Sequence, residues 1–384
     1  MAKLSKRHLR IAYLTENKEE YKTYGYSNEE CGELNSEHAR SEVISGLEAL
    51  GHNVEYVGDI KSLVIRLAQA DHGNFPWDLV FNDTSGFRGS AREAQVPGLL
   101  EAYNIPFTFS NASTFATCLD KGITKMALEF YGIPTAPFAI ISSDSVNSKK
   151  YSKPALRAIY ESKYSSEILD SFPLFVKPAA EGTSKGIDPS CKVFKIHDLE
   201  TTVADLCRQY TGQDILIETF LKGREFTVGI AGSGEKSKVI GILETCWNNG
   251  GRSAHLQEHV QLGVTNSKPN ASDFFTFDLK DKWGSLGNEP VEMSPDPDDP
   301  EVRSACENAL KAWKALKCRD LGRVDLRSDG FGANAVPCVI EINPLAGLTP
   351  GRSCLCVIAQ NSGISYPELL DLAVESARER IQAA

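Results

Sequence analysis

Two short segments, residues 323–325 and 341–343, carry side chains whose types and spacing could do chemistry. They read Arg-Val-Asp and Glu-Ile-Asn, so each has an apolar residue between two polar ones. In a β-strand, alternate residues point to the same face. Each segment, if it is a strand, would therefore present both of its polar side chains together.

Asp325, Glu341 and Asn343 offer two carboxylates and one amide oxygen. Oxygen ligands suit a hard divalent cation that keeps waters and nucleotide phosphates as its other ligands. Arg323 could face negative charge that develops during a reaction. The alternative is a cross-strand ion pair on the surface. We favour the metal site, because a neutral Asn beside two carboxylates is an odd choice for ion pairing.

A second candidate is the segment 177–186, KPAAEGTSKG, which follows the apolar run Leu174-Phe175-Val176. Free backbone N–H groups and hydroxyls in such a turn can surround phosphate oxygens, and Lys177 would add a point charge. The lysine precedes the glycines, so this is not a Walker loop. Taken alone, the segment fits an exposed turn better than a phosphate site.

A third candidate follows the apolar strand that ends at Ile217. Backbone groups from Glu218 to Leu221 could bind adenine, and Glu225 could accept hydrogen bonds from ribose hydroxyls, because a carboxylate is a pure acceptor. As a fragment, the same residues fit a hairpin with a charged tip better.

The elements that position these residues begin with an open parallel α/β sheet, expected to extend to about residue 112. Strands are predicted at 11–14, 54–57 and 79–82. Between the first two, apolar residues at helical spacing end at Gly51, a typical helix stop. A further helix is expected at 91–103. Alternating strands and helices favour a parallel sheet.

The remaining chain is predicted to form two further domains, 113–217 and 218–384. The first should contain a helix at 119–131 and a strand at 136–141, followed by a polar surface insertion. The second should be antiparallel, with strands at 225–231, 239–246 and 338–342 and helices at 301–317 and 367–382. Residues 247–295 are rich in Asn, Gly, Ser, Asp and Pro and are expected to form long loops.

The composition of the chain argues against several classes of function. The chain has 41 Lys+Arg against 51 Asp+Glu, a net charge of -10, which argues against a nucleic-acid partner. No apolar run reaches the length of a membrane span, and the N-terminus lacks the long apolar stretch of a secretory signal. The ten cysteines are scattered without a metal-ligand pattern and indicate free thiols in a reducing cytoplasm.

The order of six motifs resembles the ATP-grasp ligases, and specifically the D-alanine–D-alanine ligases. The motifs are LDKGITK, FVKPAAEGTSKG, LIETFLKGREFTV, FTFDLKDK, GRVDLRSDG and VIEINPLAGLT. Each one alone is weak, but six in this order are not expected by chance. The resemblance implies three domains, with an N-terminal open parallel sheet and a nucleotide held between two mixed or antiparallel α+β domains.

The resemblance also implies roles for individual residues. Lys121 and Lys177 would contact the ATP phosphates, and Lys280 would reach the γ-phosphate from a long loop. Arg323 and the backbone N–H of Gly347 would stabilise an oxyanion. The glycine-rich loop would cover the phosphates. The adenine segment would hold the base, and Glu225 would hold the ribose. Asp325, Glu341 and Asn343 would hold two Mg²⁺ ions, with Mn²⁺ as a substitute. In full, the expected ATP ligands are Lys121, Lys177, Glu181, Gly182, Thr183, Ser184, Glu218, Thr219, Phe220, Leu221, Glu225 and Lys280, and the expected metal ligands are Asp325, Glu341 and Asn343.

The substrate-binding motifs of those ligases match less well. Glu33 is the candidate for the glutamate that orients the first substrate. The segment FNDTSGFRGSAREAQ replaces a histidine-containing motif, and Ala346 stands where a proline precedes the oxyanion glycine. One extra residue precedes Ser353, so Arg352 is an alternative ligand for the acceptor carboxylate.

The sequence thus predicts an ATP-dependent ligase that joins an amino-acid carboxylate to an amine through an acylphosphate, with substrates other than D-alanine. Two alternatives stay open: a phosphotransferase acting on a small carboxylate, and a nucleotide-binding relative without turnover. The resemblance makes a cytoplasmic homodimer the expected form, with small-molecule substrates and no membrane partner.

Overall fold

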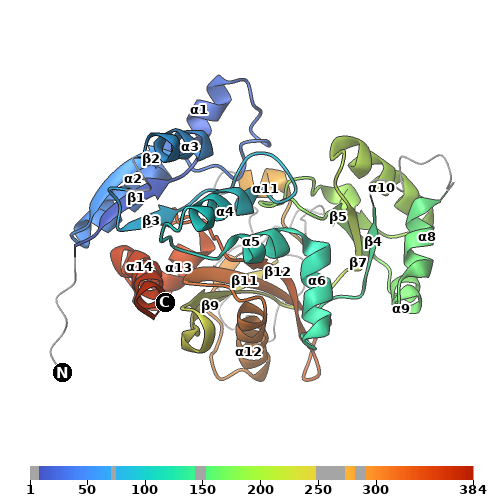
Figure 1. Cartoon of the computed structure of the whole chain (residues 1–384). Coiled ribbons are helices and arrows are strands. Elements are labelled where there is room, and N and C mark those ends of the chain that lie inside the picture. The colour runs from blue at the N-terminus through green and yellow to red at the C-terminus, as the bar shows by residue number, and fades with distance from the viewer. Residues whose placement is uncertain (1–7, 71–74, 143–152, 248–272, 282–290, 384) are drawn as a thin grey trace, which may run out of the picture.

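The computed structural model describes residues 8–70, 75–142, 153–247, 273–281 and 291–383 of the chain. Three β-sheets organise these residues, and they are built from three consecutive parts of the chain (Figure 1). Helices cover the sheets (Figure 1).

The N-terminal sheet is parallel, as predicted, with strand order β2-β1-β3. Its central strand pairs Ile11 with Val54 on one side and with Leu79 on the other. Gly51 has a φ of 88° and ends helix α2 in the left-handed region, which glycine adopts without strain. The elements of this part are β1 (Arg10–Leu14), α1 (Lys18–Thr23), α2 (Glu37–Ala49), β2 (Asn53–Gly58), α3 (Ile60–Gln69), β3 (Leu79–Asn82), the 3₁₀ turn η2 (Arg92–Ala94) and α4 (Gln95–Ala102).

The second sheet is antiparallel, with strand order β4-β7-β5-β6. It follows helices α5 (Ala112–Leu119) and α6 (Lys121–Phe130). Helices α8 and α10 pack on it around a core of its own, formed by residues between Ala139 and Ile217. The elements are β4 (Phe138–Ile141), α8 (Pro154–Glu161), α9 (Ser165–Asp170), β5 (Leu174–Pro178), η3 (Pro189–Cys191), β6 (Lys192–Val193), α10 (Ile196–Gln209) and β7 (Ile215–Thr219). The expected polar insertion, residues 143–152, lies outside the described residues.

The third sheet is antiparallel, as predicted, with strand order β10-β9-β8-β11-β12. Within the expected loop region 247–295, a short helix and a short strand are described, and residues 248–272 and 282–290 lie outside the described residues. The elements are β8 (Glu225–Ala231), η4 (Gly234–Lys236), β9 (Lys238–Cys246), α11 (Phe277–Asp281), β10 (Val291–Met293), α12 (Pro300–Ala315), β11 (Leu321–Ser328), β12 (Pro337–Asn343), α13 (Cys354–Asn361) and α14 (Tyr366–Ala383).

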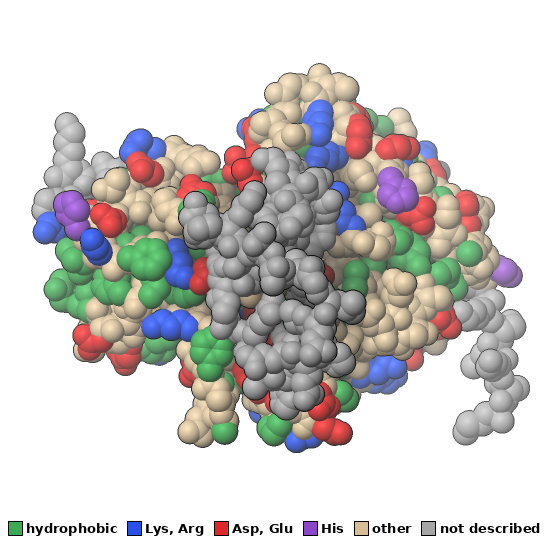
Figure 2. Space-filling model, turned by 180° about the vertical axis from the view of Figure 1, so that it is seen from behind, with side chains coloured by type: hydrophobic (Ala, Val, Ile, Leu, Met, Phe, Trp, Pro, Cys, Tyr) green, Lys and Arg blue, Asp and Glu red, His purple; other side chains and the backbone are tan. Residues whose placement is uncertain are grey.

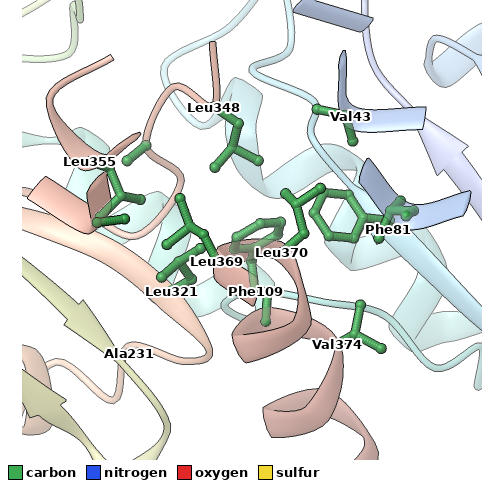
Figure 3. Close-up of a cluster of buried hydrophobic side chains, with 14 of the residues drawn as sticks. Val43, Phe81, Phe109, Ala231, Leu321, Leu348, Leu355, Leu369, Leu370 and Val374 are labelled. Carbon is green, nitrogen blue, oxygen red and sulfur yellow. The ribbon is translucent and has the colours of Figure 1, made fainter. Parts of the chain in front are cut away.

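The N-terminal sheet shares its core with the C-terminal helices. Figure 3 shows Val43 of α2 and Phe81 of β3 in one cluster with Leu370 and Val374 of α14 and with Leu321 at the start of β11. Helix α12 packs on the third sheet in a second cluster around the fully buried Trp313. The first and third parts of the chain are therefore held together by apolar burial.

Charged side chains of both signs are interspersed over the described part of the face in Figure 2, which shows no broad basic area. None of the helices in the described residues is long and apolar enough to cross a membrane.

We expect Leu370→Ala to lower the free energy of unfolding by about 3 kcal/mol, because Leu370 is fully buried in the shared core. Urea unfolding would measure the loss. Glu379→Ala in the same helix is the control, since Glu379 makes only an exposed ion pair with Lys236. A loss below about 1 kcal/mol for Leu370→Ala would contradict the shared core.

Candidate active site

Strands β11 and β12 bring the four strongest candidates together. Arg323 pairs with Asn343, and Asp325 pairs with Glu341, in one antiparallel register. The predicted arrangement of both segments on strands is confirmed. Asn343 donates a hydrogen bond from Nδ2 to Asp325 Oδ2 over 3.1 Å. Thr227 of β8 donates from Oγ1 to Asp325 Oδ1 over 3.0 Å, which fixes that carboxylate.

Lys121 connects this strand pair to the rest of the site. It is the first residue of α6, where the Asp120 side chain caps the helix by accepting from the N–H of Ile123. Lys121 Nζ lies 3.0 Å from Glu341 Oε1. Burial alone would raise the pKa of Glu341, but Lys121 and Arg323 hold that pKa at about 2. Glu341 is therefore an anion at neutral pH.

The donor set fits a metal ion that also takes ligands from a substrate. No group of three or more His, Cys, Asp or Glu side chains in the described residues could hold a metal alone. The site supplies two carboxylates, Asp325 and Glu341, and the amide oxygen of Asn343, whose amide nitrogen is engaged with Asp325. Mg²⁺ typically takes one or two carboxylates and completes its shell with phosphates and water.

A buried charge cluster lies on the second sheet. Lys177 of β5 lies 2.6 Å from Glu218 Oε1, and Lys125 of α6 lies 2.8 Å from Glu218 Oε2. Burial would raise the pKa of Glu218, yet the two lysines hold it at about 2. Burial lowers the pKa of Lys125, and Glu218 opposes that shift. The Glu218 side chain thus positions two ammonium groups.

The segment after β7 is held by backbone and cationic contacts. The N–H of Thr219 donates to the Pro137 carbonyl over 3.0 Å, and that of Phe220 donates to the Pro173 carbonyl over 3.2 Å. The Phe220 ring has Lys192 Nζ at 3.8 Å and Arg327 Cζ at 4.7 Å from its centroid. Leu221, the last residue of the expected adenine segment, is half-buried.

Glu225 begins β8 close to this segment. It accepts from Trp247 Nε1 over 3.0 Å and from Arg327 over 3.3 Å. Burial raises the pKa of Glu225, and Arg327 opposes the increase. A ribose hydroxyl at Glu225 would thus meet an acceptor already oriented by two donors.

The glycine-rich loop has an unusual backbone. Thr183 and Ser184 have φ values of 49° and 58°, and Gly186 has 72°. The left-handed region is rare for a β-branched residue such as Thr, and strain of this kind concentrates at functional sites. Glu181 Oε2 lies 2.7 Å from Lys185 Nζ, and Lys121 Nζ donates to the Glu181 carbonyl. The loop is therefore tied to the start of α6.

Glu33 joins this loop to the N-terminal part of the chain. The N–H of Gly182 donates to Glu33 Oε1 over 2.8 Å, and Arg92 Nη2 lies 2.8 Å from Glu33 Oε2. Lys185 Nζ lies 3.3 Å from the same carboxylate. Burial would raise the pKa of Glu33, but Arg92 and Lys185 keep it below its usual value. In this arrangement Glu33 connects two parts of the chain; its role toward a substrate stays a prediction.

Lys280 lies on α11, next to the glycine-rich loop. The N–H of Phe277 donates to the Ile187 carbonyl over 3.2 Å, which anchors this helix. Lys280 Nζ is 5.1 Å from the centroid of the Phe275 ring. Its charge also contributes to the low pKa of Glu341, so Lys280 lies in the neighbourhood of that carboxylate.

The remaining candidates lie after β12. A Cβ atom at Gly347 would come within 2.8 Å of Ser353 Oγ, so a side chain at this position would displace the serine hydroxyl. Ser353 Oγ accepts from the N–H of Thr349 over 3.1 Å. Arg352 is exposed. Ser353 is thus placed next to Gly347, whereas the Arg352 side chain faces solvent.

Three residues near the site were not expected from the sequence. Lys125 and Arg92 neutralise Glu218 and Glu33, and both are buried. Glu93 is half-buried and interacts electrostatically with Glu341 and Lys121; burial raises its pKa to about 8. Lys125 lies in the motif LDKGITK, so this motif could have marked it as a candidate site residue. Arg92 and Glu93 lie in a segment to which no motif gave a role.

Known proteins of similar sequence place the chain in a family. The family model described as D-ala D-ala ligase C-terminus matches residues 128–251 and 253–375. A D-alanine–D-alanine ligase of Gluconobacter oxydans is 28% identical over 341 residues, 88% of this chain and 92% of that protein. One of Sinorhizobium medicae is 27% identical over 355 residues, 92% of this chain and 95% of that protein.

Solved structures show the same fold. The D-alanine–D-alanine ligase of Bacillus anthracis complexed with ATP superposes with a TM-score of 0.64 at 22% identity, covering 98% of this chain and all of that one. The ligase of Coxiella burnetii gives a TM-score of 0.65 at 19% identity and covers 98% and 95% of the two chains.

The antiparallel sheets, the glycine-rich loop and the family match define an ATP-grasp carbon–nitrogen ligase. Within that class, the chain belongs to the D-alanine–D-alanine ligase family, whose C-terminal model covers more than half of its residues.

We expect acid to destabilise the native protein partly through Glu218. Its native pKa of about 2 lies below the ordinary 4.5, so its stabilising effect is complete above pH 4.5 and lost as the pH falls toward 2. The free energy of unfolding should decrease by about 3 kcal/mol through this group as the pH falls from 4.5 to 2. Unfolding by urea at several pH values would show a smaller decrease for Glu218→Gln than for the wild type. The exposed control Glu307→Gln should follow the wild type, and equal decreases in all three would contradict this role.

Proposed function

We propose that this chain forms an amide bond between an amino-acid carboxylate and an amine, driven by ATP through an acylphosphate. The observation that carries the proposal is the register of β11 and β12, which places two carboxylates, an amide and an arginine together, with Lys121 beside them. Such a set can hold a metal–triphosphate complex and stabilise the charge of a transferring phosphoryl group.

Each group would have a distinct task. Lys121, Lys177 and Lys280 would neutralise phosphate oxygens, and the glycine-rich loop would donate backbone N–H groups to them. Asp325, Glu341 and Asn343 would hold Mg²⁺, for which we propose two ions. Bound there, the metal would screen the triphosphate charge and orient the γ-phosphate.

The oxyanion that forms when the amine attacks would be met by Arg323 and the N–H of Gly347. Arg323 acts through charge, because a guanidinium does not release its proton here. The neighbouring Asp325 accepts a hydrogen bond from Arg323 and orients it. Burial would lower the pKa of the Arg323 guanidinium, but Asp325 raises it above its usual value. Attack releases phosphate and leaves the amide.

The proposed substrates differ from two molecules of D-alanine, although the relatives carry the name D-alanine–D-alanine ligase. The support lies in the N-terminal part, where Arg92 and Lys185 neutralise Glu33. A carboxylate engaged with two cations is a poorer partner for the ammonium group of an amino acid. The homodimer stays a prediction.

A reaction assay tests the proposal. With ATP, Mg²⁺ and a panel of D- and L-amino acids, we expect ADP and phosphate in equal amounts with a new amide, at the highest rate for a pair other than D-alanine with itself. Mass spectrometry identifies the product. AMP and pyrophosphate would contradict the acylphosphate. A phosphorylated product that forms without an amine would favour the phosphotransferase, and ATP binding without turnover would favour a non-catalytic relative.

Glu341→Gln should reduce turnover by at least 100-fold, because the amide cannot supply the negative charge that balances the metal and Lys121. The control Glu307→Gln changes an exposed glutamate and should keep wild-type turnover. Circular dichroism would establish that both variants fold. A Glu341→Gln enzyme with more than a tenth of wild-type activity would exclude Glu341 as a metal ligand.

A further inference from the structure

A cavity of about 290 Å³ lies between the N-terminal part of the chain and the glycine-rich loop. Three segments form it: the connection between α1 and α2, the turn after β3, and the loop 181–185 together with the end of α10. Its lining residues are Glu29, Glu30, Phe87, Arg88, Glu181, Lys185, Gln209 and Tyr210. Of the candidate glycine-rich segment 177–186, Glu181 and Lys185 contribute to it.

The charges in the cavity fall into two groups. Lys185 is already neutralised, because it lies 2.7 Å from Glu181 and 3.3 Å from Glu33. Arg88 and Glu30 are not neutralised in this way. Within the described residues, neither side chain has an oppositely charged partner within 4.0 Å. Arg88 donates to the Tyr26 hydroxyl over 3.1 Å, a neutral acceptor.

The carboxylates also have neutral partners. Glu30 accepts from the N–H and hydroxyl of Ser27 over 2.9 Å and 2.8 Å. Glu29 accepts from the Tyr210 hydroxyl over 2.7 Å. One guanidinium and two carboxylates therefore border the same space without forming an ion pair with each other, which leaves both signs of charge for a ligand.

The apolar part of the wall consists of packed aromatic rings. The Phe87 ring packs on Tyr21 at 4.9 Å and on Tyr26 at 4.4 Å between centroids. Across the cavity, the Tyr210 ring packs so closely on Gly186 that a Cβ there would lie 2.6 Å from it. Two packed aromatic rings, Phe87 and Tyr210, thus line the cavity together with the charged groups.

We propose that this cavity is a second binding site, separate from the reaction centre, for a small zwitterion of the size of an amino acid or dipeptide. The ligand carboxylate binds Arg88, since a guanidinium can hold it with two hydrogen bonds. Its ammonium group binds Glu29 and Glu30, and its aliphatic part lies between Phe87 and Tyr210. The volume is at the small end of ligand sites, which excludes a nucleotide.

Isothermal titration calorimetry with L-alanyl-L-alanine tests the proposal on the full chain without ATP or metal, so its outcome does not depend on ligase activity. We expect saturable binding that weakens at least tenfold in Arg88→Ala and in Glu30→Gln. Arg303→Ala, an exposed arginine elsewhere, should bind as the wild type does. N-acetyl-alanylalanine and alanylalanine amide, which each lack one charge, should bind at least tenfold more weakly.

Equal affinities of the wild type and Arg88→Ala would overturn the proposal, because the dipeptide would then bind elsewhere, such as the reaction centre. The absence of any heat of binding at about 10 mM L-alanyl-L-alanine would overturn the proposal as well. A dissociation constant of about 10 mM is the weakest binding expected for a ligand of this size. Arg88→Ala and Glu30→Gln should retain wild-type ATP turnover with the substrates found in the reaction assay, since neither residue belongs to the proposed catalytic machinery.

Discussion

The arrangement of the site depends on keeping buried ammonium groups charged. Lys121, Lys125 and Lys177 are each at most 6% exposed. A lysine without water retains its proton only when carboxylates neutralise it. Glu341 and Glu218 do so, and both keep pKa values near 2 despite burial. This constraint explains how a chain of net charge -10 can bury the ammonium groups that the proposed triphosphate site requires. The excess of acids is a property of the whole chain, whereas ligand charge is matched by a few local groups.

Apolar packing holds the first and third parts of the chain together, and ion pairs connect the second part to the first. The N-terminal sheet and the third sheet share one core with α13 and α14, while the second sheet has its own core (Figure 3). Glu33, Arg92 and Lys185 connect the glycine-rich loop of the second part to the first. Contacts of this polar kind break more readily than a shared apolar core. The position of the loop over the site therefore depends on charges, and the proposed zwitterion cavity borders the same connection.

Features that local patterns determine could be predicted from the sequence. Alternation placed Arg323 and Asp325 on a strand, and the structure pairs them with Asn343 and Glu341. Contacts between distant segments could not be predicted, because nothing local specifies them. The Lys125–Glu218 pair joins residues 93 positions apart in sequence across two elements. The Arg92–Glu33 pair depends on how the loop after β3 meets the connection between α1 and α2, and neither segment has a periodic pattern.

The central claim is that the γ-phosphate of ATP is transferred to a substrate carboxylate. The most direct test uses a carboxylate substrate labelled with ¹⁸O in both oxygens, with ATP, Mg²⁺ and the amine. Phosphoryl transfer to the carboxylate, followed by attack of the amine, moves one carboxylate oxygen to the released phosphate. The account predicts one ¹⁸O atom in the inorganic phosphate for each amide formed, read by mass spectrometry. Unlabelled inorganic phosphate, with one ¹⁸O in AMP for each amide formed, would contradict it.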